Sequence, residues 1–210
     1  RHPGLRPHHA PLTAATSPAL TSMEILILPA ALGLIVLLWF MGTYNGLIRL
    51  RNHCRESWAD IDTELKRRYD LIPNVVAVVK RYAAHEQHLF EEIAAARARA
   101  NTTDHTGTHV GELCRAENEL LRGVRRVFAV AEAYPALKAD AQFLRLQQEL
   151  VNTEDRIQAS RRFFNANVRD LNNRVESVPS SLVASMAGIG PAEFFEMDDL
   201  AICAPAAVRF

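Results

Sequence analysis

The chain has 210 residues, enough for one ordinary domain and a short extension. Lys plus Arg and Asp plus Glu both number 24, so the formal net charge is zero. This balance argues against a general nucleic-acid-binding protein, which usually carries a basic excess. Only 9 glycines and 10 prolines accompany 49% apolar residues. The composition therefore argues against an all-β fold with many tight turns and favours long helices.

Residues 1–22 are rich in Pro, His, Thr and Ala and show no hydrophobic periodicity, which predicts a disordered tail. The next segment, residues 25–42, has 18 residues without a charge, enough to cross the hydrocarbon core of a membrane as a helix. A buried core helix is disfavoured, because the flank is a disordered tail and no other segment of the chain is as apolar. A cleaved signal peptide would carry a positive charge before the apolar run and a small-residue cleavage site after it. We therefore predict a transmembrane anchor over residues 23–43, with the lipid bilayer as the partner of residues 25–42.

The charges on either side of the anchor predict its orientation. Arg49, Arg51 and Arg55 closely follow the apolar run, whereas Glu24 precedes it. Basic residues concentrate on the cytoplasmic side of membrane spans. We therefore expect a single-pass protein of the cell (inner) membrane, with a short N-terminus outside and the bulk of the chain in the cytoplasm.

Beyond the anchor, apolar residues recur at steps of three and four, the pattern of helices packed in bundles and coiled coils. We predict an all-α fold, with an N-terminal single transmembrane helix followed by an elongated antiparallel three- to four-helix bundle over residues 44–177. The four apolar stripes cover residues 47–65, 75–100, 113–134 and 143–175.

Prolines and polar runs predict where these helices end. Pro73 predicts that the first helix ends near Asp70. The polar residues 101–111 form a linker between the second and third helices. Pro135 ends the third helix, and the fourth is expected to run unbroken from about Ala136 to Ser177.

Two segments are candidates for binding a protein partner. One lies at the predicted end of the first helix, where the alternative is that its cations cap the helix. The other lies in residues 178–210, an irregular tail that either packs on the bundle or docks a partner through two aromatic anchors. The candidate residues are Lys66, Arg67, Arg68, Tyr69 and Asp70 in the first segment and Phe194 and Phe195 in the second.

No constellation of catalytic or metal-binding residues is apparent. The three cysteines, at positions 54, 114 and 203, are scattered and form no CxxC pair, so we expect reduced thiols. His85 and His88 are three residues apart, whereas a zinc-peptidase helix needs a spacing of four. No histidine has a glutamate three residues before it, as a di-iron bundle would need. We therefore predict no enzyme activity, no cofactor and no metal site, and the charge balance argues against a nucleic-acid partner.

Short motifs along the chain carry a family resemblance. The most specific is residues 65–74, LKRRYDLIPN, and others are YNGLIRLRN at 44–52, WADID at 58–62, YAAHE at 82–86, YPALK at 134–138, FLRLQQEL at 143–150, TEDRI at 153–157, the residues Phe164, Asn165 and Asn172, PSSL at 179–182 and FFE at 194–196. With these motifs the chain resembles the LemA family of bacterial membrane-anchored proteins over about residues 24–210. It departs from the family at Cys54, at Val178 and in the linker at 101–111. The resemblance implies a single-pass protein with a helical cytoplasmic domain, and it brings no established catalytic residues.

Three functional hypotheses follow. The first is a membrane-anchored, non-enzymatic helical scaffold or adaptor that binds other proteins near the membrane. The second is an accessory factor in envelope stress or membrane proteolysis, a role that the resemblance suggests. The third is a metal- or ligand-binding helical bundle.

Overall fold

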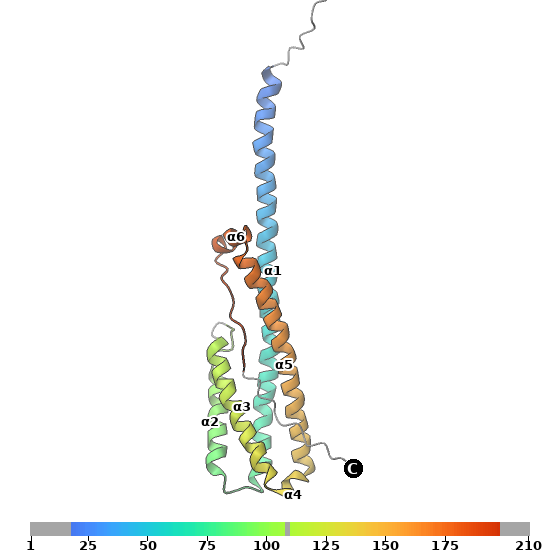
Figure 1. The fold of residues 1–210 in the computed structure, drawn as a ribbon, viewed down its shortest axis with the longest axis vertical. Helices are drawn as coiled ribbons and strands as arrows, with labels where there is room; N and C mark the ends of the chain where they lie inside the picture. The colour runs from blue at the N-terminus through green and yellow to red at the C-terminus, as the bar shows by residue number, and fades with distance from the viewer. Residues whose placement is uncertain (1–17, 108–109, 198–210) are drawn as a thin grey trace, which may run out of the picture. The chain divides into compact units, whose positions relative to one another are not determined.

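The computed structural model describes residues 18–107 and 110–197, with side chains described from Ile27 onward. Within these residues all regular elements are helices, and no strand occurs (Figure 1). This confirms the prediction of an all-α fold with a long apolar N-terminal helix and a bundle. The helices are α1 (Pro18–Lys80), α2 (Gln87–Thr102), α3 (Val110–Glu132), α4 (Pro135–Lys138), α5 (Ala141–Glu176) and α6 (Ser180–Met186).

The chain divides into two compact units, Arg1–Thr43, here the N-terminal unit, and Tyr44–Phe210, here the helical unit. In the N-terminal unit, α1 exposes its large apolar side chains. Only 6% of its most apolar 18-residue stretch is buried, whereas the core helix of a soluble protein would be mostly buried. Among the described residues, α1 is the one helix long and apolar enough to cross a membrane. More than half of each of these side chains is exposed: Ile27, Leu28, Leu32, Leu34, Ile35, Val36, Leu37, Leu38 and Met41.

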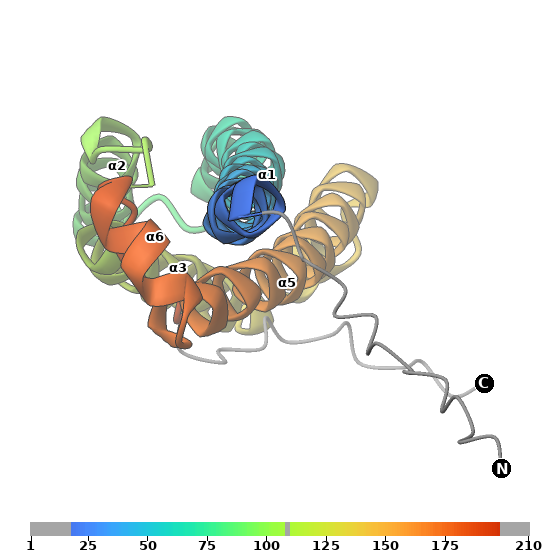
Figure 2. The same ribbon diagram turned by 90° about the horizontal axis from the view of Figure 1, so that it is seen from above.

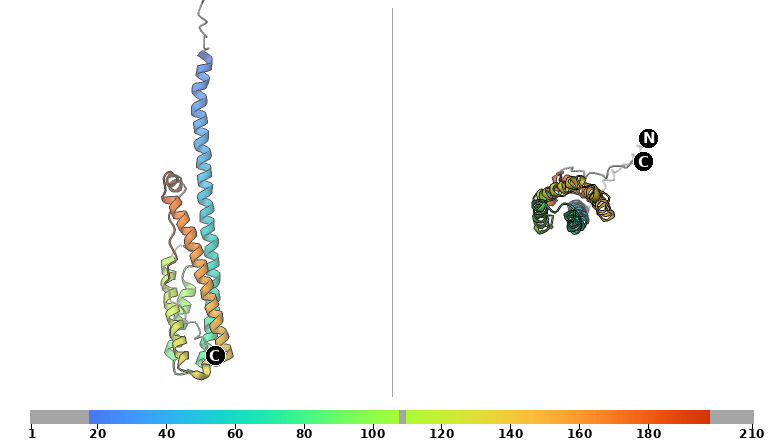
Figure 3. Two further views of the ribbon diagram at one scale, coloured as in Figure 1. Left: turned by 45° about the vertical axis from the view of Figure 1, so that its right-hand side comes forward. Right: turned by 90° about the horizontal axis from the view of Figure 1, so that it is seen from below.

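The helical unit packs four long helices, the part of α1 from Tyr44 onward with α2, α3 and α5. Viewed from above and from below, α2, α3 and α5 form an arc with this part of α1 on its concave side (Figures 2 and 3). Consecutive long helices run in opposite directions, as short connections require. The predicted apolar stripes meet in the core, where the fully buried aliphatic residues include Leu47, Ile61, Leu65, Leu113, Leu120, Leu150 and Ile157.

The prediction that the first helix ends near Asp70 is wrong, because α1 continues through Pro73 to Lys80. A proline inside a helix has no N–H to donate to the carbonyl four residues earlier, which here belongs to Tyr69. In the structure Arg97 Nε of α2 donates to that Tyr69 oxygen at 2.5 Å. A side chain from the neighbouring helix thus replaces the hydrogen bond that Pro73 cannot make.

Two other helix boundaries also differ from the prediction. The second helix begins at Gln87 and not near Val75, after a turn in which Tyr82 and Ala83 both bond back to the Val79 carbonyl. The fourth helix is not continuous, because the short α4 ends at Lys138 and α5 starts anew after Asp140. The Asp140 carboxylate caps α5 by accepting hydrogen bonds from the backbone N–H groups of the second and third residues of that helix, at 2.8 and 3.0 Å.

Candidate functional site

A cluster of charged side chains lies inside the bundle and joins three of its helices. Arg68 of α1 is fully buried, and its Nη1 donates to Glu154 Oε2 of α5 at 2.8 Å. Its Nη2 donates to the Glu117 carboxylate of α3, which also accepts a hydrogen bond from the Tyr69 hydroxyl. Arg68, Tyr69, Glu117 and Glu154, here the buried charge cluster, are at most 6% exposed. The cluster ties α1, α3 and α5 together at one level of the bundle.

The electrostatics of the cluster make its pairing obligatory. Charged groups are costly to bury unless they are paired and hydrogen-bonded, and here one guanidinium serves two carboxylates. Burial raises the pKa of Tyr69 well above its usual value, so the Tyr69 hydroxyl stays protonated and can donate to Glu117. The Arg68 Nε is buried and has no hydrogen-bond partner in this structure. Glu117 and Glu154 therefore share Arg68 as their cation, through its two terminal nitrogens.

The loop between α2 and α3 packs on α1, and its His105 ring lies edge-on to the Tyr69 ring of the cluster, with the centroids 6.1 Å apart. The Trp58 indole Nε1 of α1 donates to the His105 carbonyl of this loop at 2.6 Å. His105 Nδ1 lies 2.8 Å from Asp62 Oδ1, within ion-pair distance, although the two atoms are not aligned for a hydrogen bond. Gly107 adopts φ +78°, and a Cβ there would stand 3.3 Å from the Trp58 ring. A glycine therefore lets the loop lie flat against Trp58.

The first predicted partner-binding segment is only partly on the surface. Lys66, Arg67 and Asp70 are exposed, but Arg68 and Tyr69 are buried, so the prediction of a surface is wrong for these two. The alternative that these cations cap the end of a helix is also wrong, because α1 continues to Lys80. Arg68 and Tyr69 lie three and four residues after the buried Leu65, on the face of α1 that points into the bundle.

Sequence reasoning missed Glu117 and Glu154, although a signal was present. Each stands four residues after a core leucine and three residues before another core aliphatic side chain. A carboxylate at such a position needs a buried cation. The core residues that bracket them are Leu113 and Leu120 for Glu117, and Leu150 and Ile157 for Glu154.

A second constellation holds the segment after α6 against α5. Asn172 Nδ2 donates to the Ala192 carbonyl at 3.0 Å, and its Oδ1 accepts from the Ala192 N–H at 2.8 Å. Asn165 forms the same pair of bonds with Phe195, at 3.1 and 2.9 Å. Seven helical residues rise about 10.5 Å, and three extended residues span about 10 Å, so the two spacings match. Both asparagines belong to the residues that carry the family resemblance, but the sequence does not show that they hold the segment after α6 against α5.

Of the two predicted aromatic anchors, one is buried and one is partly exposed. Phe195 is fully buried, and its ring lies 5.5 Å from the Trp58 ring in an edge-on contact. Trp58 also contacts Phe164 of α5 at 5.2 Å, which completes an aromatic cluster. Phe194 remains 39% exposed. The prediction of an exposed anchor therefore does not hold for Phe195, whose ring fills the core of its own chain.

The reactive groups of the described residues are shielded or dispersed. Cys54 and Cys114 are free and buried, and burial raises the pKa of both thiols, which keeps them protonated and poorly nucleophilic. Cys203 lies outside the described residues. His88 is largely exposed and contacts Glu92 at 3.2 Å. Among the side chains that the structure describes, residues 27–107 and 110–197, no group of three or more His, Cys, Asp or Glu is placed to hold a metal ion.

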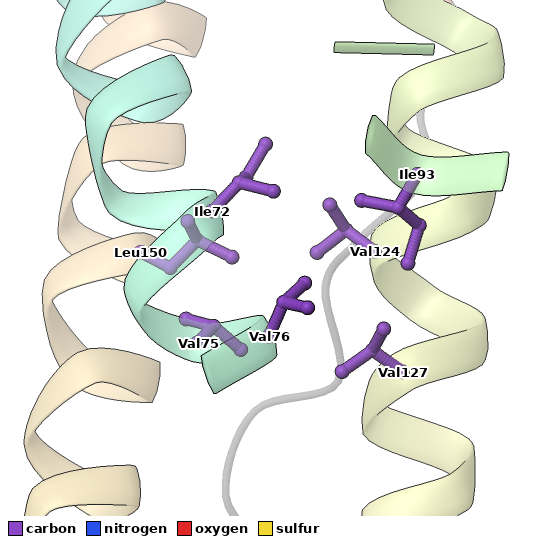
Figure 4. Close-up of a pocket in the computed structure, with 7 residues that line it drawn as sticks. All are labelled: Ile72, Val75, Val76, Ile93, Val124, Val127 and Leu150. Atoms are coloured by element: carbon purple, nitrogen blue, oxygen red, sulfur yellow. The ribbon is translucent and has the colours of Figure 1, made fainter. Parts of the chain in front are cut away.

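Beside the charge cluster, the core contains a small apolar cavity of about 10 Å³ (Figure 4). Figure 4 shows side chains from α1, α2, α3 and α5 that point toward one another around it. A space of this size holds at most one water, and a water there would find no polar side chain to bond. The lining residues are Ile72, Val75, Val76, Ile93, Val124, Val127 and Leu150.

Comparison with known proteins identifies the family. The LemA family model matches residues 57–210, well over half of the chain. The magnetosome protein MamQ of Magnetospirillum gryphiswaldense is 22% identical over 174 residues, which cover 72% of this chain and 64% of that protein. Magnetosome protein MamQ 2 of Paramagnetospirillum magneticum is 22% identical over 175 residues, and again 64% of its length is covered. With the family model spanning the charge cluster, the aromatic cluster and both asparagines, the chain belongs to the LemA family.

Proposed function

We propose that this protein is a membrane-anchored, non-enzymatic scaffold or adaptor of the LemA type, whose bundle binds other proteins near the membrane. The observation that carries the proposal is the exposure of the apolar part of α1. Leu28, Leu32 and Leu38 are each at least 60% exposed, a distribution suited to lipid and not to water. The anchor would hold the helical unit at the membrane surface, where an adaptor acts.

The non-enzymatic part of the proposal is supported by the chemistry of the helical unit. Its most unusual polar groups, the buried charge cluster, already bond one another and are shielded from solvent. The thiols of Cys54 and Cys114 are protonated and buried. A catalytic site would instead need a reactive group beside an accessible pocket.

The orientation of the anchor is part of the same proposal. Arg49, Arg51 and Arg55 are exposed on α1 directly after the apolar stretch, and the positive-inside rule then favours a cytoplasmic helical unit. A cysteine replacing the exposed Glu91 would report the side of the membrane. In intact cells and a Cys203→Ala background, a membrane-impermeant maleimide should label this Glu91→Cys protein only after the membrane is permeabilised. Labelling without permeabilisation would indicate the opposite orientation, with the helical unit outside the cell.

The adaptor role is tested by crosslinking within membranes. The exposed Arg67 and Phe194 are the available members of the predicted partner-binding segments, and Glu91 is a matched exposed control on α2. A photoreactive amino acid at Arg67 or Phe194 should give discrete crosslinked products that are absent when it replaces Glu91. The same background pattern at all three positions would count against the adaptor role.

A further inference from the structure

The short helix α6 carries an unpartnered apolar stripe. Its Val183 and Ala184 are buried against the helical unit. Val178, Leu182 and Met186 are 83%, 66% and 77% exposed, the three highest values among large apolar side chains in the described part of the helical unit. Leu182 and Met186, four residues apart, lie on one face of α6, and the exposed Val178 lies two residues before this helix begins. Water is a poor solvent for three such side chains in a row.

The chain around α6 is also free of charge. From Ser177 to Ala192 there is no Asp, Glu, Lys or Arg, and the stretch is bounded by Glu176 and Glu193. A charged side chain is costly to move into a lipid environment, so an uncharged stretch is what insertion requires. The face of α6 opposite the stripe needs no charges, because that face packs on the bundle.

The position of α6 within the helical unit indicates which surface the stripe faces. Figure 1 places α6 at the end of the helical unit where its part of α1 begins. Consistent with this, Arg51 and Arg55 of α1 line a cavity of about 270 Å³ together with Gly188 and Ile189, which closely follow α6. The packed core of the unit starts at the fully buried Leu47. This end of the unit is thus formed by residues that closely follow the apolar stretch.

The chain between that stretch and the core is short. Gly42 ends the apolar run and Leu47 is buried, so the connection spans at most about 18 Å even when fully extended. A bilayer adds about 5–8 Å of headgroup region on each side of its hydrocarbon core. With residues 25–42 in the bilayer, as proposed above, the chain itself keeps Leu47, where the packed core starts, within about 18 Å of the end of the apolar stretch.

The charges at this end of the helical unit are compatible with a bilayer surface. Arg49, Arg51 and Arg55 are exposed on α1 and suit anionic headgroups. Glu176 and Glu193, which bound the uncharged stretch, are exposed as well, so the charge here is mixed. The apolar stripe is the feature that favours a lipid surface, and the arginines add a preference for anionic lipid.

We propose that α6 is a second membrane contact, in which Val178, Leu182 and Met186 insert among the lipid headgroups beside the anchor. Amphipathic helices that lie in the interface bury their apolar face to this shallow depth. The contact would fix the tilt of the bundle on the membrane, which a single anchoring helix leaves free. The inference rests on the proposed membrane anchor, and the experiment below separates the two.

Spin-label accessibility in the full-length protein tests this contact. In a Cys203→Ala background, which keeps only the buried Cys54 and Cys114, one exposed cysteine introduced at Leu182, Met186, Leu144 or Leu34 carries a nitroxide. The protein is reconstituted in vesicles of phosphatidylcholine and phosphatidylglycerol. Leu144 is the matched control, a 45% exposed apolar residue at the opposite end of α5, and Leu34 reports on the anchor. Labels at Leu182 and Met186 should favour collisions with oxygen over those with a water-soluble nickel chelate, whereas the label at Leu144 should favour the chelate.

The outcomes are distinct. If Leu182 is as accessible to the chelate as Leu144 while Leu34 stays protected, the α6 contact is wrong and the anchor stands. If Leu34 is also accessible, the anchor fails and the α6 contact fails with it. If the labels at Leu182 broaden one another's spectra, a second copy of the chain covers the stripe and the lipid contact is overturned.

A charge substitution provides an independent test. Leu182→Glu, with the spin label at Met186, should bring the accessibility of that label to the chelate up to the level of Leu144, whereas Leu182→Met should leave it unchanged. Both variants should keep the helix content of the parent protein, because Leu182 is mostly exposed. A label at Met186 that stays protected in Leu182→Glu would contradict the proposal.

Discussion

Two neighbouring layers of the bundle core are built in opposite ways, and both contain residues of α1, α3 and α5. One is the buried charge cluster, centred on Arg68. The other begins at Ile72, four residues further along α1, and consists only of aliphatic side chains (Figure 4). Apolar contacts are non-directional and allow many packings, whereas a guanidinium between two carboxylates accepts few arrangements. The difference suggests that the apolar layer supplies stability, while the charged layer selects one register of α1, α3 and α5.

The largest expected effect comes from removing the common cation. Arg68→Met should lower the free energy of unfolding by about 3–5 kcal/mol, because Glu117 and Glu154 lose their buried partner. Urea unfolding of the detergent-solubilised protein, followed by circular dichroism, measures the change. Lys66→Met, an exposed control on the same helix, should change it by no more than about 0.5 kcal/mol. If both variants lower the free energy of unfolding equally, the charged layer is no more sensitive to loss of its cation than the exposed surface of the same helix.

Neutralising the whole cluster should then recover much of the loss. Arg68→Met combined with Glu117→Gln and Glu154→Gln removes the uncompensated charges, so about half or more of the 3–5 kcal/mol should return. The same urea unfolding measures this recovery. A triple variant no more stable than Arg68→Met would show that lost side-chain packing, and not charge, explains the first result.

The apolar layer should be sensitive to volume instead of charge. A Cβ at Gly123 of α3 would lie 2.9 Å from Ile93 Cγ1, so Gly123→Ala overpacks the contact between α2 and α3. We expect a net loss of about 1–2 kcal/mol, despite the higher helix propensity of alanine. At Gly111, in the first turn of α3, nothing lies within 4 Å of the added Cβ, so Gly111→Ala should cause no loss. Thermal unfolding of both variants measures the difference. A melting temperature of Gly123→Ala that is no lower than that of Gly111→Ala would contradict the close packing.

Filling the small cavity should stabilise the protein slightly. Val124→Ile adds one methylene beside the cavity of about 10 Å³, and the gain is expected to be up to about 1 kcal/mol. Comparison of urea midpoints with the parent protein measures it. A loss greater than about 1 kcal/mol would mean that this layer is already filled and as exacting as the charged one.

The smallest effect is expected outside both layers, at the start of α5. Backbone N–H donors, the Phe143 N–H foremost, and the Tyr82 hydroxyl hold the pKa of Asp140 below its usual value of 3.8. A depressed carboxyl pKa stabilises the fold above the unfolded-state value, and the stabilisation is lost as the pH falls through the folded-state value. Asp140→Asn should therefore lower the melting temperature at pH 7, and the difference should shrink below pH 3.8. A difference that is the same at both pH values would exclude this charge as its cause.

Much of the fold is predictable from local pattern. The apolar periodicity predicted the helices, and the uncharged run at residues 25–42 predicted the helix that, among the described residues, is long and apolar enough to cross a membrane. The motif at residues 65–74 carried the family resemblance, which the family model confirms. The roles of single residues in that motif were not predictable. Whether Pro73 ends a helix depends on whether another side chain bonds to the Tyr69 carbonyl, and Arg97 is 24 residues further along the chain.

The sequence by itself determined the helical class, the apolar segment, the absence of a CxxC pair and the family. Each of these depends on neighbouring residues or on short motifs. Only the tertiary structure decided that Arg68 and Tyr69 are core residues, that Phe195 is buried, and that Asn165 and Asn172 hold an extended segment. It also showed that Leu182 and Met186 remain uncovered. These features depend on partners far apart in the chain. A charge can be buried at low cost in free energy only when folding brings its counterion from another helix.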